Sequence, residues 1–185
     1  MSCTGCCSST GQCLAGTAPS ACGSDGDACV VCPSGMCGGG MCSSAVVLFG
    51  GQGSGSLLGD TWTFNGTSWT QVSVSNPPPA RASATMATLG NGVVLFGGGT
   101  ATGGLLSDTW TFDGTIWTQV LVSNPPPERV SAMMATLGNE VVLFGGQGTT
   151  GLLGDTWTFN GTSWTLSSVL NAPPARESAT MATLR

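Results

Sequence analysis

From residue 45 onward, short apolar segments alternate with stretches rich in Gly, Asn, Ser, Thr and Pro. Segments such as VVLF at Val93 are continuously apolar, whereas DTWTF at Asp108 alternates Thr with Trp and Phe. That alternation places the aromatic side chains on one face of a strand and the threonines on the other. Because the segments are short, β-prone and bounded by turn residues, the pattern predicts an all-β fold.

Five features recur three times in the same order, with a period of 47 or 48 residues. They are VVLFGG at Val46, Val93 and Val141; DTWTF at Asp60, Asp108 and Asp155; a second tryptophan at Trp69, Trp117 and Trp164; an arginine after the prolines at Arg81, Arg129 and Arg176; and ATL at Ala87, Ala135 and Ala182. Only the spacing between VVLFGG and DTWTF changes, so the variation lies in one loop. Such self-similarity predicts stacked repeat units.

Each unit is predicted to hold four strands. SATMATL from Ser83 and VVLF from Val93 are divided by a turn at residues 90–92. DTWTF and the segment that starts at the second tryptophan form a hairpin, because Asn-Gly or Asp-Gly between them accommodates positive φ. The segments NPPP, NPPP and NAPP lack backbone N–H donors, so they separate one sheet from the next.

The order of the strands is permuted. The repeat region opens at Val46 with a second strand, and it closes at residues 178–184 with a first strand. A ring of three blades lies below the roughly four to eight that propellers use. We therefore expect the closing segment, with Ser178, Thr180, Met181 and Leu184 as strand donors, to complete the first sheet of another copy. Such head-to-tail contacts yield either a six-bladed ring of two chains or an open series.

The VVLFGG, DTWTF, paired tryptophan and Pro-Pro-Ala-Arg motifs resemble the kelch repeat, particularly its bacterial form. The resemblance covers residues 45–185 and implies four-stranded blades of a β-propeller, about three of them here. Galactose oxidase shares this type of fold but requires His and Tyr at its copper, and this chain has neither. We therefore do not expect galactose oxidase activity from this chain.

The amino-acid composition excludes several classes of function. The net charge is −5, charged residues make up 7% of the chain and Lys plus Arg number four, so binding to nucleic acid or to an anionic membrane is not expected. The absence of His removes the usual proton shuttle, and no carboxylate pair lies near a nucleophile. We expect no enzyme activity and no cofactor. No apolar run is long enough to span a bilayer, and the first residues lack a signal-peptide pattern.

Residues 1–44 form a separate region that is rich in cysteine. All nine cysteines lie there, at Cys3, Cys6, Cys7, Cys13, Cys22, Cys29, Cys32, Cys37 and Cys42. A segment with so few apolar residues cannot bury a core, so we interpret it as a module held by disulfides, with one thiol left over. Zinc bound by the two C-x-x-C pairs is the alternative. The run resembles Cys-rich modules that precede repeat domains in secreted bacterial proteins, which implies an extracellular or cell-surface location.

Several residues in the repeats are candidate sites, each with a structural alternative. Asp60, Asp108 and Asp155 are candidate Ca²⁺ ligands, as is the Asp25-Gly26-Asp27 run, although turn capping is favoured for the three repeated aspartates. Asn65 and Asn160 lie in N-x-T sequences, the acceptor pattern for N-linked glycosylation, but Asn-Gly is also a common turn sequence. The repeated arginines are expected to bond carbonyls or Glu128 and Glu177 between blades. The six tryptophans, with Met86, Met134 and Met181, are expected in the core rather than on a sugar-binding face.

The sequence thus predicts a secreted structural protein that self-assembles by strand complementation into a fibre or surface layer. Surface sugars on its Ser and Thr residues would keep such an uncharged fibre soluble. The alternative is a fragment of a longer kelch propeller that binds protein or carbohydrate.

Overall fold

The computed structural model describes residues 6–7, 13–14, 37–38, 41–42 and 45–184. In the cysteine-rich region, β1 (Cys6–Cys7) pairs antiparallel with β2 (Cys13–Leu14), and β3 (Cys37–Gly38) pairs with β4 (Met41–Cys42). The predicted disulfides, the zinc alternative and the Asp25-Gly26-Asp27 run lie outside the described residues or concern side chains that are not described. Those interpretations stay predictions.

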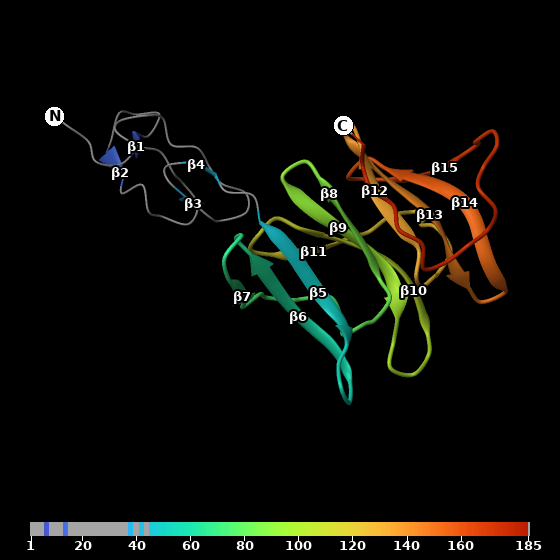
Figure 1. Cartoon of the computed structure of the whole chain (residues 1–185), viewed down its shortest axis with the longest axis horizontal. Helices are drawn as coiled ribbons and strands as arrows, with labels where there is room; N and C mark the ends of the chain where they lie inside the picture. The colour runs from blue at the N-terminus through green and yellow to red at the C-terminus, as the bar shows by residue number, and fades with distance from the viewer. Residues whose placement is uncertain (1–5, 8–12, 15–36, 39–40, 43–44, 185) are drawn as a thin grey trace.

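The repeat region folds into three antiparallel sheets, which lie side by side in Figure 1. The first sheet has three strands, β5 (Val46–Gln52), β6 (Leu57–Phe64) and β7 (Trp69–Val72). The second has four, β8 (Thr85–Leu89), β9 (Gly92–Gly99), β10 (Leu105–Phe112) and β11 (Trp117–Val120). The third repeats this order with β12 (Met133–Leu137), β13 (Glu140–Gly148), β14 (Gly151–Phe159) and β15 (Trp164–Ser167).

The predicted strand order is confirmed, although several boundaries are shifted: β6, for example, begins at Leu57 rather than at Asp60. β8 begins at Thr85 rather than at Ser83, because Ser83 has a φ of 55° and leaves the extended conformation. Its carbonyl instead accepts a hydrogen bond from the N–H of Ser131 at 2.8 Å, which links consecutive units. The residues before each first strand therefore connect neighbouring sheets.

The double glycine bends each second strand. At Phe96 the register between β9 and β10 shifts, and the next residue, Gly97, has a φ of 66°. A Cβ at Gly97 would lie 2.7 Å from the carbonyl oxygen of Arg129. Glycine is needed here both for the left-handed backbone and for the close approach of the following linker.

Two apolar cores lie between consecutive sheets, so no sheet is stable by burying its own faces alone. Leu95, Phe112 and Trp117 of the second sheet pack on Val47 and Phe49 of the first. The next core joins Val94 and Phe96 to Leu143, Phe159 and Trp164 of the third sheet. The predicted blade stacking is therefore what fills the core.

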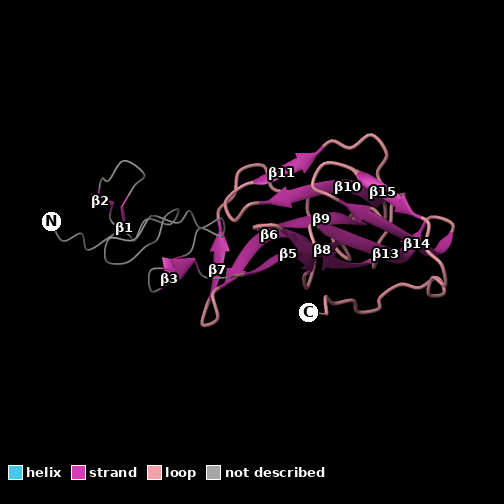
Figure 2. Ribbon diagram, turned by 90° about the horizontal axis from the view of Figure 1, so that it is seen from above, coloured by secondary structure: helices cyan, strands magenta, loops and turns pink. Residues whose placement is uncertain are grey.

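The C-terminal segment lies beside β12, the first strand of the third blade (Figure 1). Thr183 Oγ1 donates to the carbonyl of Thr136 at 2.6 Å, as Thr136 Oγ1 donates to the carbonyl of Thr88 at 2.6 Å. Ser178 N–H likewise bonds Ser131 O, as Ser131 N–H bonds Ser83 O. The segment thus takes the place of the first strand of a following blade, although it forms no ladder and is drawn as a loop in Figure 2.

Candidate functional site: the joints between blades

A buried arginine joins the first blade to the second. The backbone of Arg81 is held by the first blade, where its N–H donates to Leu58 O and its carbonyl accepts from Gly51 N–H. Its side chain reaches the second blade and donates from Nη1 to Gly97 O at 3.0 Å. The guanidinium also contacts both carboxylate oxygens of Asp108, at 2.6 and 2.8 Å, and is fully buried.

Asp108 is held as a charged acceptor. Burial by itself would raise the pKa of Asp108, but hydrogen bonds from Arg81 and Trp110, together with the positive charge of Arg81, hold this pKa below its usual range. The indole Nε1 of Trp110 donates to Oδ2 at 2.7 Å. Asp108 therefore bonds two cationic N–H groups and one indole N–H, which is the satisfied form of a buried ion pair.

The joint between the second and third blades repeats this geometry. Arg129 contacts the two oxygens of Asp155 at 2.7 and 2.8 Å and donates to Gly145 O at 2.9 Å. Trp157 Nε1 donates to Asp155 Oδ2 at 2.6 Å, and the pKa of Asp155 is likewise lowered against the effect of burial. The repeated Arg and Asp therefore form the same joint twice within the chain.

The sequence analysis predicted that these arginines bond backbone carbonyls or Glu128 and Glu177. The carbonyl partners are confirmed, whereas the glutamate partners are wrong. Gly97 and Gly145 supply the expected carbonyls, but Asp108 and Asp155 are the carboxylate partners rather than Glu128 and Glu177. The Asp lies 26 or 27 residues after its Arg, in the next blade, so only the stacking brings the two together. The equal spacing of Arg and Asp in every repeat was the signal that could have revealed the pair.

One arginine and one aspartate of the repeats remain unpaired among the described residues. They lie at opposite ends of the series of blades. In the part of the chain that the structure describes, Arg176 is exposed and its side chain bonds only Pro174 O, at 2.9 Å. Asp60 accepts from Trp62 Nε1 at 2.6 Å through Oδ2, while its Oδ1 is buried and accepts no hydrogen bond. The first blade thus offers half of a joint, and the third blade offers the complementary half.

A tryptophan completes each joint from the other side. Trp117 donates to Thr61 Oγ1 of the preceding blade at 2.9 Å, and Trp164 donates to Thr109 Oγ1 at 2.9 Å. Both indoles are buried, with exposed fractions of 2% and 6%. The equivalent Trp69 of the first blade is 47% exposed and, among the described aromatic residues, stacks on Phe64 of its own sheet alone. The tryptophan prediction is therefore confirmed for Trp117 and Trp164 and is wrong for Trp69.

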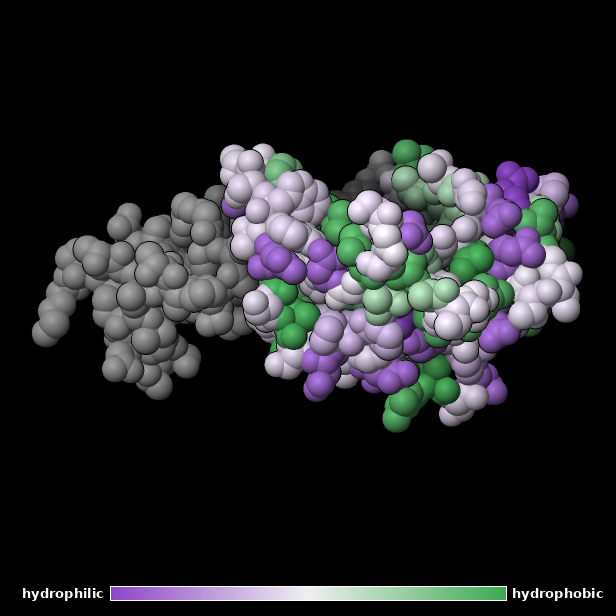
Figure 3. Space-filling view, turned by 90° about the horizontal axis from the view of Figure 1, so that it is seen from below, coloured by the Kyte–Doolittle hydropathy of each residue, from purple (hydrophilic) through white to green (hydrophobic). Residues whose placement is uncertain are grey.

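The two end blades also expose apolar side chains whose repeat equivalents are more buried. On the first blade, Val46 and Leu48 of β5 are exposed, whereas Val141 and Leu95 at equivalent positions are buried. On the third blade, Leu137 and Val169 are exposed. Figure 3 shows that on the face it displays, apolar and polar residues are interspersed.

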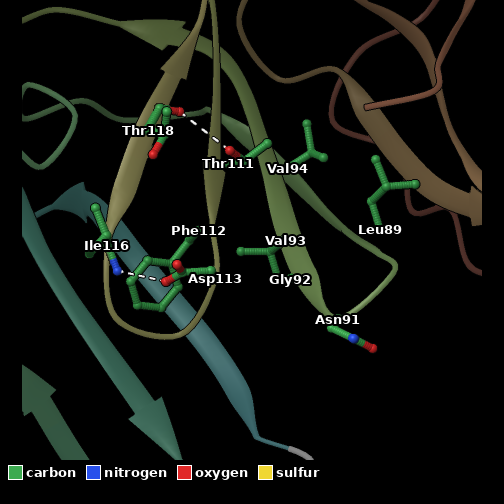
Figure 4. A pocket seen from close by; sticks show the side chains of 10 residues that line it. All are labelled: Leu89, Asn91, Gly92, Val93, Val94, Thr111, Phe112, Asp113, Ile116 and Thr118. Atoms are coloured by element: carbon green, nitrogen blue, oxygen red, sulfur yellow. Dashed lines mark hydrogen bonds between the residues drawn. The ribbon is translucent and has the colours of Figure 1, made fainter. Parts of the chain in front are cut away.

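A pocket of about 310 Å³ opens in the second blade, between the β8–β9 and β10–β11 turns (Figure 4). It is lined by Leu89, Asn91, Gly92, Val93, Val94, Thr111, Phe112, Asp113, Ile116 and Thr118. Ile116 stands where the other repeats carry Ser68 and Ser163. Hydrogen bonds from the backbone of Ile116 and Thr115 outweigh burial and lower the pKa of Asp113, so this carboxylate is committed to its own turn.

The remaining candidate residues are also placed by the structure. Asn65 Oδ1 accepts from the N–H groups of Thr67 and Ser68, and Asn160 does the same in the third repeat, as the turn interpretation predicts. Glycosylation at both sites stays a prediction.

Met134 is buried, whereas Met181 is half-buried. Among the described residues, no three acidic or cysteine side chains gather into a metal site. Asp108 and Asp155 instead pair with the arginines of the joints.

Stacked antiparallel blades that are joined by buried Arg–Asp pairs define a repeat scaffold of the β-propeller type. Residues 41–185 match the family model described as the KLHDC2/KLHL20/DRC7 Kelch-repeats domain. The chain therefore belongs to the kelch-repeat family, whose domains mediate protein interactions and are generally not catalytic. A comparison with curated proteins found no match. In the described part of the chain, no helix is long and apolar enough to cross a bilayer.

Proposed function

We propose that this chain is a structural protein that self-assembles head to tail by strand complementation outside the cell. The observation that carries the proposal is the position of residues 178–184, which lie where the first strand of a following blade belongs. The first blade has three strands, and within the described residues no strand pairs with the outer edge of β5. An edge that presents free N–H and C=O groups is a template for an added strand.

The location outside the cell is supported by the nine cysteines, because disulfides persist in oxidising compartments. The fibre or surface layer expected from the sequence and a closed ring are both products of the same head-to-tail contact. The rotation at the joint decides which of them forms.

The test removes residues 178–185 and leaves Arg176 in place. We expect the full chain to form assemblies in size-exclusion chromatography with light scattering, and the shortened chain to run at 18 kDa or slightly less. Circular dichroism serves as the control that the blades still fold, since the removed segment is mostly exposed. A shortened chain that assembles as the full chain does would overturn strand complementation.

A second function, binding of a protein segment or a sugar by one propeller face, is favoured by the pocket beside Ile116. The apolar side chain of Ile116 in its lining is particular to the second repeat, because the other two repeats carry serine at this position. An Ile116→Ser variant restores the repeat consensus without touching the joints. We expect it to abolish capture on peptide and glycan arrays while assembly is unchanged; equal capture by both proteins would exclude the pocket.

A further inference from the structure

The two unpaired half-joints match each other group by group. In the joints within the chain, the earlier blade supplies the arginine and a threonine hydroxyl, while the later blade supplies the aspartate, a glycine carbonyl and the tryptophan. The third blade retains the first set in Arg176 and Thr156. The first blade retains the second set in Asp60, Gly50 and Trp69.

Arg176 and Asp60 are already positioned to bind a partner. The backbone of Arg176 is already fixed by Gly146 N–H and Leu153 O, as the backbone of Arg129 is fixed by Gly98 N–H and Leu106 O. Asp60 Oδ1 is removed from water and unbonded, which is costly for a carboxylate. A second copy is the partner whose chemistry satisfies both groups at once.

From this match we infer that two copies close into a six-bladed ring, in which Arg176 of each copy pairs with Asp60 and with Gly50 O of the other. The inference rests on the proposed self-assembly and adds the side chains that hold each joint. In the same joint, Trp69 donates to Thr156 Oγ1 of the neighbouring copy. The repeat register places Thr180 opposite Phe49 and Thr183 opposite Val46, as Thr85 pairs with Phe96 and Thr88 with Val93.

Closure follows from the equivalence of the joints. If the contact between copies repeats the contact between blades, each copy continues the same rotation, and the blade number of the assembly is a multiple of three. Propellers use roughly four to eight blades, and six is the only multiple of three in that range. Two copies, each with the three blades that the structure describes, therefore make up the six-bladed ring.

Charge reversal tests this arrangement. In Arg176→Asp, two carboxylates face each other at both joints, and in Asp60→Arg, two guanidinium groups do so. We expect each variant alone to raise the dissociation constant of the dimer by about 100-fold or more. An equimolar mixture should restore a dimer, because one joint then holds the native pair and the other holds the reversed pair. Glu128→Arg, a charge reversal at an exposed position outside the joint between copies, should leave the dimer intact.

Analytical ultracentrifugation separates the outcomes. The inference expects a species of twice 18.4 kDa that does not grow with concentration, and a mixed dimer whose formation also shows that both variants are folded. If each variant alone dimerises as the parent chain does, the Arg176–Asp60 pair is wrong while strand complementation stands. Masses that increase with concentration would overturn the ring but not self-assembly. A parent chain that stays monomeric would overturn both.

Discussion

Arg129 places its guanidinium on both carboxylate oxygens of Asp155, at 2.7 and 2.8 Å, across the boundary between the second and third blades. The arginine side chain is fully buried, and its backbone belongs to the preceding blade. A single residue therefore spans two units, so the stability of one blade depends on the next.

Breaking this pair should unfold the repeats at lower denaturant. Arg129→Ala leaves a partly buried carboxylate without its cation, and we expect a loss of about 3–5 kcal/mol in the free energy of unfolding. Urea unfolding followed by tryptophan fluorescence measures it. The matched control is Arg176→Ala in the chain without residues 178–185, where the arginine is exposed and the expected change is below about 0.5 kcal/mol. Equal losses at the two positions would contradict the assigned role.

The two ion pairs should also make stability depend on pH in the acid range. The pKa values of Asp108 and Asp155 are lowered in the folded chain, so their contribution is fully present above the unfolded carboxyl pKa of about 3.9. It is lost as the pH falls from there through the lowered, folded values. Unfolding curves between pH 7 and pH 2 should show a shallower acid loss for Asp155→Asn than for the parent chain. Parallel curves would count against the pairing.

The bond between Trp117 and Thr61 should appear as a coupling energy between neighbouring blades. Trp117→Phe removes the indole donor, Thr61→Val removes the hydroxyl acceptor, and the double variant removes both. We expect a coupling of about 0.5–1.5 kcal/mol in a double-mutant cycle of unfolding free energies. Trp69→Phe paired with Thr109→Val is the control: these side chains are not bonded to each other, so additive effects are expected.

Gly97, the first of the two adjacent glycines in the second blade, should tolerate a side chain poorly. Gly97→Ala combines a φ of 66° with a Cβ that meets Arg129 O at 2.7 Å, and we expect a loss of about 1–3 kcal/mol. Gly138 has a similar φ of 59°, but no neighbouring atom lies within 4 Å of the position that a Cβ would take, so Gly138→Ala carries the backbone strain without the clash. Thermal unfolding should rank Gly97→Ala as clearly the less stable; the reverse order would refute the close approach.

Most of the fold could be predicted from the sequence because its signals are local. Three kinds of signal each act over a few residues: the alternation in DTWTF, the Asn-Gly and Asp-Gly turns, and the prolines. Because each occurs in three repeats, they are easy to recognise in the sequence. The joints could not be predicted in full. Arg129 meets Asp155 rather than its sequence neighbour Glu128, since the stacking of blades, not proximity along the chain, sets which charges meet.

The sequence by itself determined the strands, the repeat and the absence of the usual catalytic residues, since those depend on residue type and short spacing. Only the tertiary structure decided which copies of the repeated side chains are buried and bonded. Trp117 and Trp69 occupy the same position in their repeats, yet one is 2% exposed and the other 47%. The reason is that burial depends on having a blade on the adjoining side, a property of position in the stack rather than of the residues themselves.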